Sequence, residues 1–309
     1  MVKLVLKSVL YLASVAGACA LLFWVIVPNN SNAYQAAQVD KIQLAAETES
    51  PKIMLVGGSN LAFSMNSEWL SEQAEQPVVN MGVSKAVGMR YMLEEAKPHV
   101  NAGDLIVLSP EYEVYYDIYY GSESLTVMLM HYPHLLTKLS SWGEWETFLS
   151  TFLTIMRMKV NGYIRTGVAS LEDTVYRRDG FNAHGDLTTH IDLETDLDER
   201  SLFGDESVPF QEDAIRAMNA FAAHAEARGA TVVLSFPSLY DAYLERYASR
   251  IDAMERRLRS ELTFPVISDP ADYAFPRTAL YDTPYHLLRE GRQQRTEQLW
   301  ADLQARNAM

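Results

Sequence analysis

A chain of 309 residues is long enough for one large domain or two small ones. Its 48% hydrophobic and 21% charged residues are an ordinary globular composition and argue against long disordered regions. The formal net charge of −14 argues against nucleic acid as a partner, because phosphate binding needs clustered lysine and arginine. The one cysteine, Cys19, excludes an internal disulfide, a zinc finger and a cysteine-ligated iron–sulfur cluster.

The amino terminus has the pattern of a membrane anchor. Lys3 and Lys7 precede a largely apolar run over residues 9–27, which Pro28 and a polar stretch close. A helix of this length rises about 28 Å, close to the thickness of a bilayer's hydrocarbon core. The positive flank favours the cytoplasmic side for the amino terminus. We therefore expect residues 1–28 to be a single-pass anchor or an uncleaved signal, through which the protein contacts the membrane.

Two other interpretations of the amino terminus remain open. A signal peptide could be cleaved after the small-residue site at 31–33, although the apolar run is longer than the usual signal core of about 7–15 residues. A lipoprotein could be processed at Cys19, but the apolar run continues to Val27 behind it. The length of the run favours a retained anchor over either alternative.

Beyond the anchor, we expect a stalk or short helix over residues 29–50 and a folded domain over residues 51–309. The domain alternates short apolar runs with helical segments, a pattern typical of α/β folds. The strands are expected at residues 53–56, 77–83, 104–109, 231–236 and 265–268. The helices are expected at residues 86–97, 211–228, 240–262 and 292–307. Strands that are apolar throughout indicate a parallel sheet covered on both faces.

A segment rich in tyrosine, tryptophan, phenylalanine, methionine and leucine interrupts this alternation at about residues 113–178. Such side chains at helical spacing usually pack against the core. The alternative is a helical cap that docks on the membrane or on an integral membrane protein.

The first candidate for chemistry is Ser59, in the sequence Gly-Gly-Ser-Asn that follows the first predicted strand. Ligands of parallel α/β sheets bind beyond the carboxyl ends of the strands. At the start of the next helix, the Ser59 N–H and the helix dipole could stabilise an oxyanion. The alternative is an ordinary serine cap after a glycine turn.

The second candidate is the pair Asp282 and His286, in the sequence Asp-Thr-Pro-Tyr-His. The histidine could serve as the general base for Ser59, with the carboxylate orienting the ring and stabilising its protonated form. The alternative is a turn before Pro284. No cluster of histidine and acidic residues has clear metal-ligand spacing, so we expect neither a metal nor a cofactor.

Together these motifs resemble the blocks of the SGNH hydrolase superfamily. The resemblance implies a three-layer α/β/α flavodoxin-like domain with Ser59 as nucleophile, His286 as base and Asp282 as its partner. Asn80-Met81-Gly82 looks like the second block, which implies the Gly82 N–H as an oxyanion donor beside that of Ser59. The likeness covers about residues 52–110 and 211–307.

Three positions depart from the superfamily pattern. Gly58 stands where an aspartate usually precedes the serine, and three residues instead of two separate Asp282 from His286. Asp269 or Asp272 is therefore an alternative partner for the histidine. Residues 109–112 replace the usual block that supplies an asparagine donor, which leaves Asn60 or Asn182 as candidates for the third oxyanion group.

An anchor joined to such a domain is similar to proteins of cell-surface polysaccharide O-acylation, of the alginate acetylation and teichoic-acid D-alanylation types. The resemblance implies a serine acyltransferase or esterase acting on O-acyl groups of an exported polysaccharide. Its expected place is a bacterial inner membrane, with the domain in the periplasm or outside the cell. The expected partners are the polysaccharide and a membrane-bound O-acyltransferase or other integral membrane protein. The alternative is an inactive partner that scaffolds such a complex.

Overall fold

The computed structural model describes residues 2–21, 30–166, 173–204 and 207–306. Its centre is a parallel sheet of four strands in the order β2-β1-β3-β4, which confirms the expected α/β class. The strands are β1 (Ile53–Gly57), β2 (Val78–Asn80), β3 (Leu105–Ser109) and β4 (Thr231–Leu234). Ile53 pairs with Val78 on one side and Leu105 on the other, so β1 lies inside the sheet.

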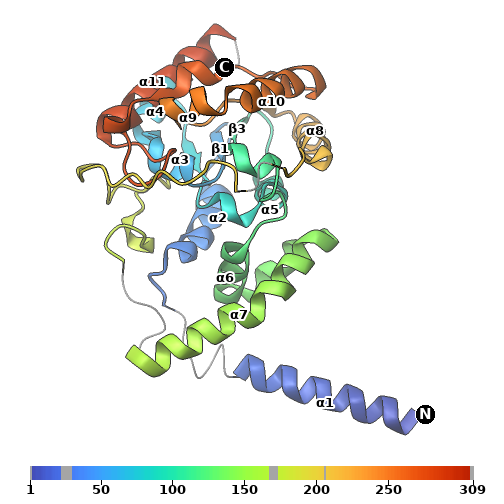
Figure 1. Cartoon of the computed structure of the whole chain (residues 1–309). Coiled ribbons are helices and arrows are strands. Elements are labelled where there is room, and N and C mark those ends of the chain that lie inside the picture. Colours follow the sequence, from blue (N-terminus) through green and yellow to red (C-terminus); the bar gives the residue numbers. More distant parts are fainter. Residues whose placement is uncertain (1, 22–29, 167–172, 205–206, 307–309) are drawn as a thin grey trace.

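Helices cover both faces of the sheet because the strands are apolar on both faces. One face packs against α3 (Ser59–Ser64), α4 (Ser67–Ala74) and α11 (Arg289–Ala305). The other packs against α5 (Met89–Ala96), α8 (Glu212–Glu226) and α10 (Ala248–Glu261). Figure 1 shows α3, α4 and α11 on one side of β1, with α5 and α8 on the other.

The predicted elements after residue 200 are partly revised. The expected strand at residues 265–268 contributes a single bridge, between Val266 and Leu234. The expected helix at residues 240–262 is divided into α9 (Asp241–Arg246) and α10. A separate two-stranded sheet joins β5 (Leu239–Tyr240) to β6 (Ala274–Phe275). Gly229 has a φ of +81°, as expected for the residue that ends α8.

Of the two interpretations left open for residues 29–50, a stalk or a short helix, the structure shows helix at residues 34–47. These residues form η2 (Tyr34–Ala36) and α2 (Ala37–Glu47), which pack on the domain. Tyr34 and Lys41 are buried, although both are polar enough to suit an exposed segment. Lys41 reaches across to the backbone carbonyls of Gly82 and Gly185, and these contacts compensate for burying its amine.

The aromatic-rich segment is largely helical. It contains η5 (Tyr112–Tyr115), α6 (Glu123–His131), η6 (Pro133–Lys138) and α7 (Trp142–Thr166). The segment up to α6 buries its aromatic and aliphatic side chains in the main core, whereas α7 packs chiefly on α6. The remaining short helices are η3 (Lys85–Val87), η4 (Lys97–His99), η7 (Arg178–Gly180), η8 (Pro270–Tyr273) and η9 (Arg277–Ala279).

At the amino terminus, α1 (Val2–Leu21) carries the first part of the predicted anchor. Residues 22–28 of that anchor lie outside the described residues. Within the described ranges, no helix has both the length and the apolar character that crossing a membrane requires.

Candidate active site

Ser59 begins α3 directly beyond the carboxyl end of β1. The turn between them is tightly packed, since a Cβ on Gly57 would lie 2.3 Å from the Ser109 carbonyl oxygen at the end of β3. Glycine is therefore required at position 57 by close approach of the neighbouring strand. The turn leaves the Ser59 side chain half-buried at the edge of the sheet where α/β ligands bind.

A carboxylate that the sequence motifs did not assign lies beside Ser59. Oε1 of the fully buried Glu111 accepts hydrogen bonds from the Asn60 N–H at 2.9 Å and from Ser59 Oγ at 3.4 Å. Its Oε2 has no hydrogen-bond partner in the described part of the chain. Glu111 follows β3 in the segment that replaces the usual asparagine block. This replacement was the one feature of the sequence that could have pointed to Glu111, because it lies at the end of β3, which neighbours β1.

Gly58 makes room for this carboxylate. A Cβ at position 58 would lie 2.4 Å from Glu111 Oε2, 2.5 Å from Oε1 and 2.4 Å from the Lys85 backbone nitrogen. These distances are too short for any side chain at position 58. Glycine is therefore required at position 58, because the Glu111 carboxylate and the Lys85 backbone occupy the space that a side chain would take.

His286 and Asp282 form a hydrogen-bonded pair despite the extra residue between them. His286 Nδ1 lies 2.7 Å from Asp282 Oδ1. The bridge between Leu280 and Leu287 closes a loop around the pair, and the Tyr281 N–H donates to the His286 carbonyl at 2.8 Å. The loop therefore absorbs the additional residue. With Nδ1–H donated to the carboxylate, Nε2 is the nitrogen left to accept a proton.

Tyr176 completes this pair. Its hydroxyl donates to Oδ2 of Asp282 and lies 3.4 Å from His286 Nδ1. Burial and the charge of Asp282 raise the pKa of Tyr176 above its ordinary value, so the hydroxyl stays protonated. Burial opposes the charge on Asp282, but the hydrogen bonds from His286 and Tyr176 outweigh it and lower the pKa of that carboxyl.

The alternative partners of the histidine are placed elsewhere. Asp269 pairs with Arg259 on the surface, and Asp272 is exposed on η8. The structure therefore selects Asp282 from the three carboxylates that the sequence left open.

His286 is held against α3 by ring stacking and by hydrogen bonds that its two chain neighbours, Tyr285 and Leu287, make with α3. Its ring stacks on Phe63, with centroids 3.7 Å apart and planes inclined by 8°. Ser64 Oγ donates to the Tyr285 carbonyl at 2.7 Å and accepts from the Leu287 N–H at 2.9 Å. Ser59 and Phe63 are four residues apart, so they lie on the same face of the helix. His286 is thus held about one helical turn from Ser59.

No hydrogen bond joins Ser59 to His286 among the described residues; the serine hydroxyl is directed to Glu111 instead. The His286 side chain is almost fully buried.

His190 is a second histidine in this assembly that the sequence did not single out for a role. Its Nε2 lies 3.1 Å from the Phe63 carbonyl oxygen and 3.0 Å from that of Leu287. Both partners are acceptors, so Nε2 carries the proton and the ring is neutral. Burial, followed by the neighbouring His286, lowers the pKa of His190 to about 4. His190 therefore links α3 to the residue after His286.

The expected oxyanion donors differ in whether they already have a hydrogen-bond partner in the protein. The Gly82 N–H donates to Asn80 Oδ1 at 2.9 Å, so it is already used inside the protein. The Asn60 amide points into the core, where Nδ2 donates to the Ser109 carbonyl at 2.8 Å and Oδ1 accepts from Arg295 at 2.7 Å. Of the three expected donors, the Ser59 N–H alone has no hydrogen-bond partner within the described residues.

Asn182 is also engaged in its own loop. Its Oδ1 accepts from the backbone N–H groups of His184 at 3.0 Å and Asp186 at 2.9 Å. These contacts fold the loop before Asp186 and leave the Asn182 side chain out of the Ser59 assembly.

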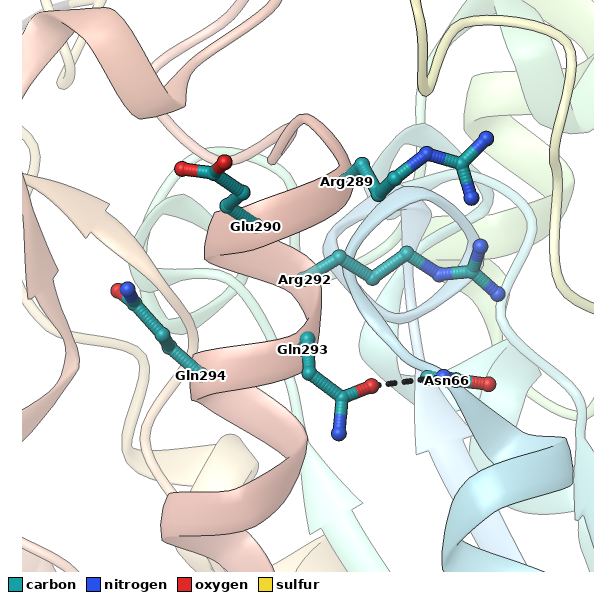
Figure 2. Close-up of a pocket in the computed structure, with 6 residues that line it drawn as sticks. All are labelled: Asn66, Arg289, Glu290, Arg292, Gln293 and Gln294. Carbon is teal, nitrogen blue, oxygen red and sulfur yellow. Dashed lines mark hydrogen bonds between the residues drawn. The ribbon is translucent and has the colours of Figure 1, made fainter.

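A polar hollow of about 500 Å³ lies at the start of α11, close in sequence to His286. Figure 2 shows Arg289 and Arg292 extending from one side of the helix and Gln293 reaching Asn66, whose Nδ2 donates to Gln293 Oε1 at 2.8 Å. The Arg292 side chain is held in place by buried Asp186, to which its guanidinium donates at 2.9 Å. Within the described ranges, no group of three or more histidine, cysteine or acidic residues is arranged to hold a metal ion.

Comparison with known proteins adds no family to this geometry: no family model matches the chain, and no curated protein matches it.

Proposed function

We propose that this protein is an SGNH-like serine acyltransferase or esterase that acts on O-acyl groups of an exported polysaccharide. The observation that carries the proposal is the His286–Asp282 pair stacked on the helix that begins with Ser59. The strand order β2-β1-β3-β4 supports a three-layer flavodoxin-like domain of the SGNH type, with Ser59 at the carboxyl edge of its sheet.

In the proposed reaction, Ser59 Oγ attacks the acyl carbonyl carbon and His286 Nε2 takes the hydroxyl proton. The Ser59 N–H at the start of α3 stabilises the oxyanion. The oxyanion then collapses, the donor's alkoxide leaves with the proton from His286, and an acyl ester on Ser59 remains. A sugar hydroxyl or water, deprotonated by His286, attacks this ester and releases Ser59. Asp282 stabilises the protonated imidazole in both steps.

The polar hollow beside the His286 loop supports a hydroxyl-rich ligand. Arg289, Arg292, Gln293 and Asn66 line it with polar groups that already have protein partners. Arg289 pairs with Asp192 and Arg292 with Asp186, so a sugar hydroxyl or carboxylate would share or replace these contacts. We propose that the acceptor glycan binds there. We also propose the place expected from the sequence, a bacterial inner membrane with the domain exported, beside a membrane-bound O-acyltransferase.

A second candidate is an inactive partner that scaffolds such a complex. Two observations favour it: Glu111 accepts the hydrogen bonds of the Asn60 N–H and the Ser59 hydroxyl, and the Gly82 N–H is already used. A negative charge beside Ser59 opposes formation of an oxyanion there. Lys85, which is paired with Glu113, lies near enough to Glu111 to offset part of that charge.

Labelling with a fluorophosphonate probe separates the two candidates. We expect the purified protein to be labelled, and Ser59→Ala and His286→Ala to abolish labelling while circular dichroism shows that both variants remain folded. Ser260→Ala is a matched control, because Ser260 lies on α10 and its hydroxyl donates to the backbone carbonyls of Arg256 and Arg257. A folded wild-type protein that resists the probe would reject the enzyme in favour of the scaffold.

A further inference from the structure

One helix of this protein exposes large apolar side chains to solvent. On α7, Trp142 is 75% exposed, Leu153 is 68% exposed and Ile164 is 74% exposed. Leu149 and Met158 on the same helix are exposed as well. Outside α1 and α7, Leu193 is the only other exposed large hydrophobic residue in the described part of the chain. Such a concentration on one element marks an interaction surface.

Most of these side chains lie along one face of α7. At about 100° per residue, Trp142, Leu149, Leu153 and Ile164 fall within an arc of about 60°. Met156 and Val160 continue this stripe between them. We call these six residues the α7 stripe. The core-facing side is different, because Phe148 is buried there and Thr151 hydrogen bonds to Thr126 of α6.

The stripe is presented by an ordered helix. Glu144 accepts from the backbone N–H groups of Ser140 and Ser141, both at 2.9 Å, and the Glu144 N–H donates to Ser141 Oγ at 3.3 Å. This reciprocal pair is a capping box that fixes the start of α7. Gly143 packs against Tyr120, since a Cβ there would lie 2.7 Å from the tyrosine ring. The first turn of α7, which carries Trp142 of the stripe, is therefore fixed in place.

The charge of α7 identifies the kind of surface it fits. α7 carries Glu144 and Glu146 near its start and Arg157, Lys159 and Arg165 further along, so its basic residues are gathered in its second half, in a chain whose net charge is −14. A helix with an apolar face and basic residues is suited to lie in the interface of an anionic membrane. Two copies of a chain with a net charge of −14 repel each other, which opposes self-association through this face.

The position of α7 in the molecule also supports a membrane as the partner of the α7 stripe. Figure 1 shows α1 and α7 at one end of the molecule and α9, α10 and α11 at the other. The side chains of α1 are also apolar and exposed, among them Leu4, Val9 and Leu12. We propose that α7 lies in the headgroup region of an anionic lipid bilayer with its stripe toward the acyl chains. This proposal is independent of any chemistry at Ser59.

The test uses a polarity-sensitive dye at single cysteines in the full chain. Cys19 is the one native cysteine, so Cys19→Ser provides a background for Leu153→Cys and, as a matched control, Thr154→Cys. Both positions are exposed, but they point about 100° apart around α7. The probe membrane is vesicles of phosphatidylethanolamine with about 30% phosphatidylglycerol. Because each dye reports on its own position, binding through α1 alone cannot produce the expected difference.

On adding vesicles, we expect the dye at position 153 to shift to the blue and its quenching by aqueous iodide to fall by about three-fold or more. The dye at position 154 should change much less. Arg157→Gln with Lys159→Gln should reduce the protection at position 153. Equal accessibility at 153 and 154 in vesicle-bound protein would overturn the proposal. So would protection of position 153 that rises with protein concentration in the absence of vesicles, which would assign the stripe to a second copy.

Discussion

The ring of Phe63 lies almost parallel to the imidazole of His286, with 3.7 Å between their centroids. Phe63 belongs to the helix that Ser59 begins, so this stack links two candidate catalytic residues that are more than 220 positions apart in the chain. His190 lies on another side of Phe63, with ring centroids 4.6 Å apart. The packing of Phe63 is therefore one of the contacts that position the proposed base, together with the hydrogen bonds from Ser64 to the neighbours of His286.

Shortening Phe63 should affect both reactivity and stability. Phe63→Ala removes the stacking surface and leaves a cavity, so we expect about 3–5 kcal/mol lower unfolding free energy and a slower reaction of Ser59 with a fluorophosphonate. Phe63→Leu keeps an apolar side chain and should lose less stability, but it still lacks the ring. Urea unfolding and labelling rates, measured on both variants, check this. A wild-type labelling rate in Phe63→Leu would contradict the role of the stack.

The carboxylate that supports His286 can be identified by three parallel substitutions. Asp282→Asn removes the acceptor charge 2.7 Å from Nδ1 and favours the wrong tautomer, so we expect about 10⁴-fold slower acyl transfer or labelling. Asp269→Asn and Asp272→Asn are matched controls, which should leave the rate within about two-fold because neither contacts the histidine. Comparable slowing in either control would reject Asp282 as the partner.

Removing the charge of Glu111 should activate Ser59. Glu111→Gln keeps the shape and the acceptor for the Asn60 N–H but removes a negative charge that opposes an oxyanion nearby. We expect roughly ten-fold faster labelling of Ser59, since Lys85 already offsets part of the charge. The measurement is a time course of probe incorporation in wild type and Glu111→Gln at equal folded fraction. Slower labelling in the variant would instead show that Glu111 assists the serine.

His190 should make stability fall in acid. Its pKa of about 4 in the folded protein lies below the ordinary value of 6.5, so between these pH values the unfolded chain binds more protons. The neutral His190 ring therefore makes its full contribution to the free energy of unfolding above about pH 6.5. This contribution falls by about 3 kcal/mol as the pH is lowered to 4. Urea unfolding of wild type and His190→Gln at pH 5 and 7 measures it.

Two other groups with shifted pKa values, His131 and Glu95, also make stability depend on pH, so they determine the controls for this measurement. Burial also lowers the pKa of His131 to about 4, so His131→Gln should remove a similar slope independently. Burial raises the pKa of Glu95 to about 8, which makes stability fall with rising pH between 4.5 and 8. The prediction therefore concerns the difference between each variant and wild type, in which the contribution of Glu95 cancels. An identical pH slope in wild type and His190→Gln would contradict it.

The local elements of the sheet were predictable because their signals lie within a few residues. The run at residues 53–56 is apolar throughout and ends in glycines, and it forms β1 almost as expected. Gly229 ends α8 in the left-handed conformation that its position indicates. Helix boundaries near Tyr247 and Arg289 were less accurate, because tertiary contacts decide where a helix begins and ends.

The sequence by itself determined the α/β class, the parallel sheet and the placement of Ser59 at the end of a strand, since hydrophobic periodicity and turn residues act over short distances. Only the tertiary structure decided which groups meet Ser59 and His286. It brought Glu111 into the space left by Gly58, chose Asp282 as partner and folded the expected stalk onto the domain. These contacts join distant segments, and burial and hydrogen bonding between such segments have no signature in the local pattern of residues.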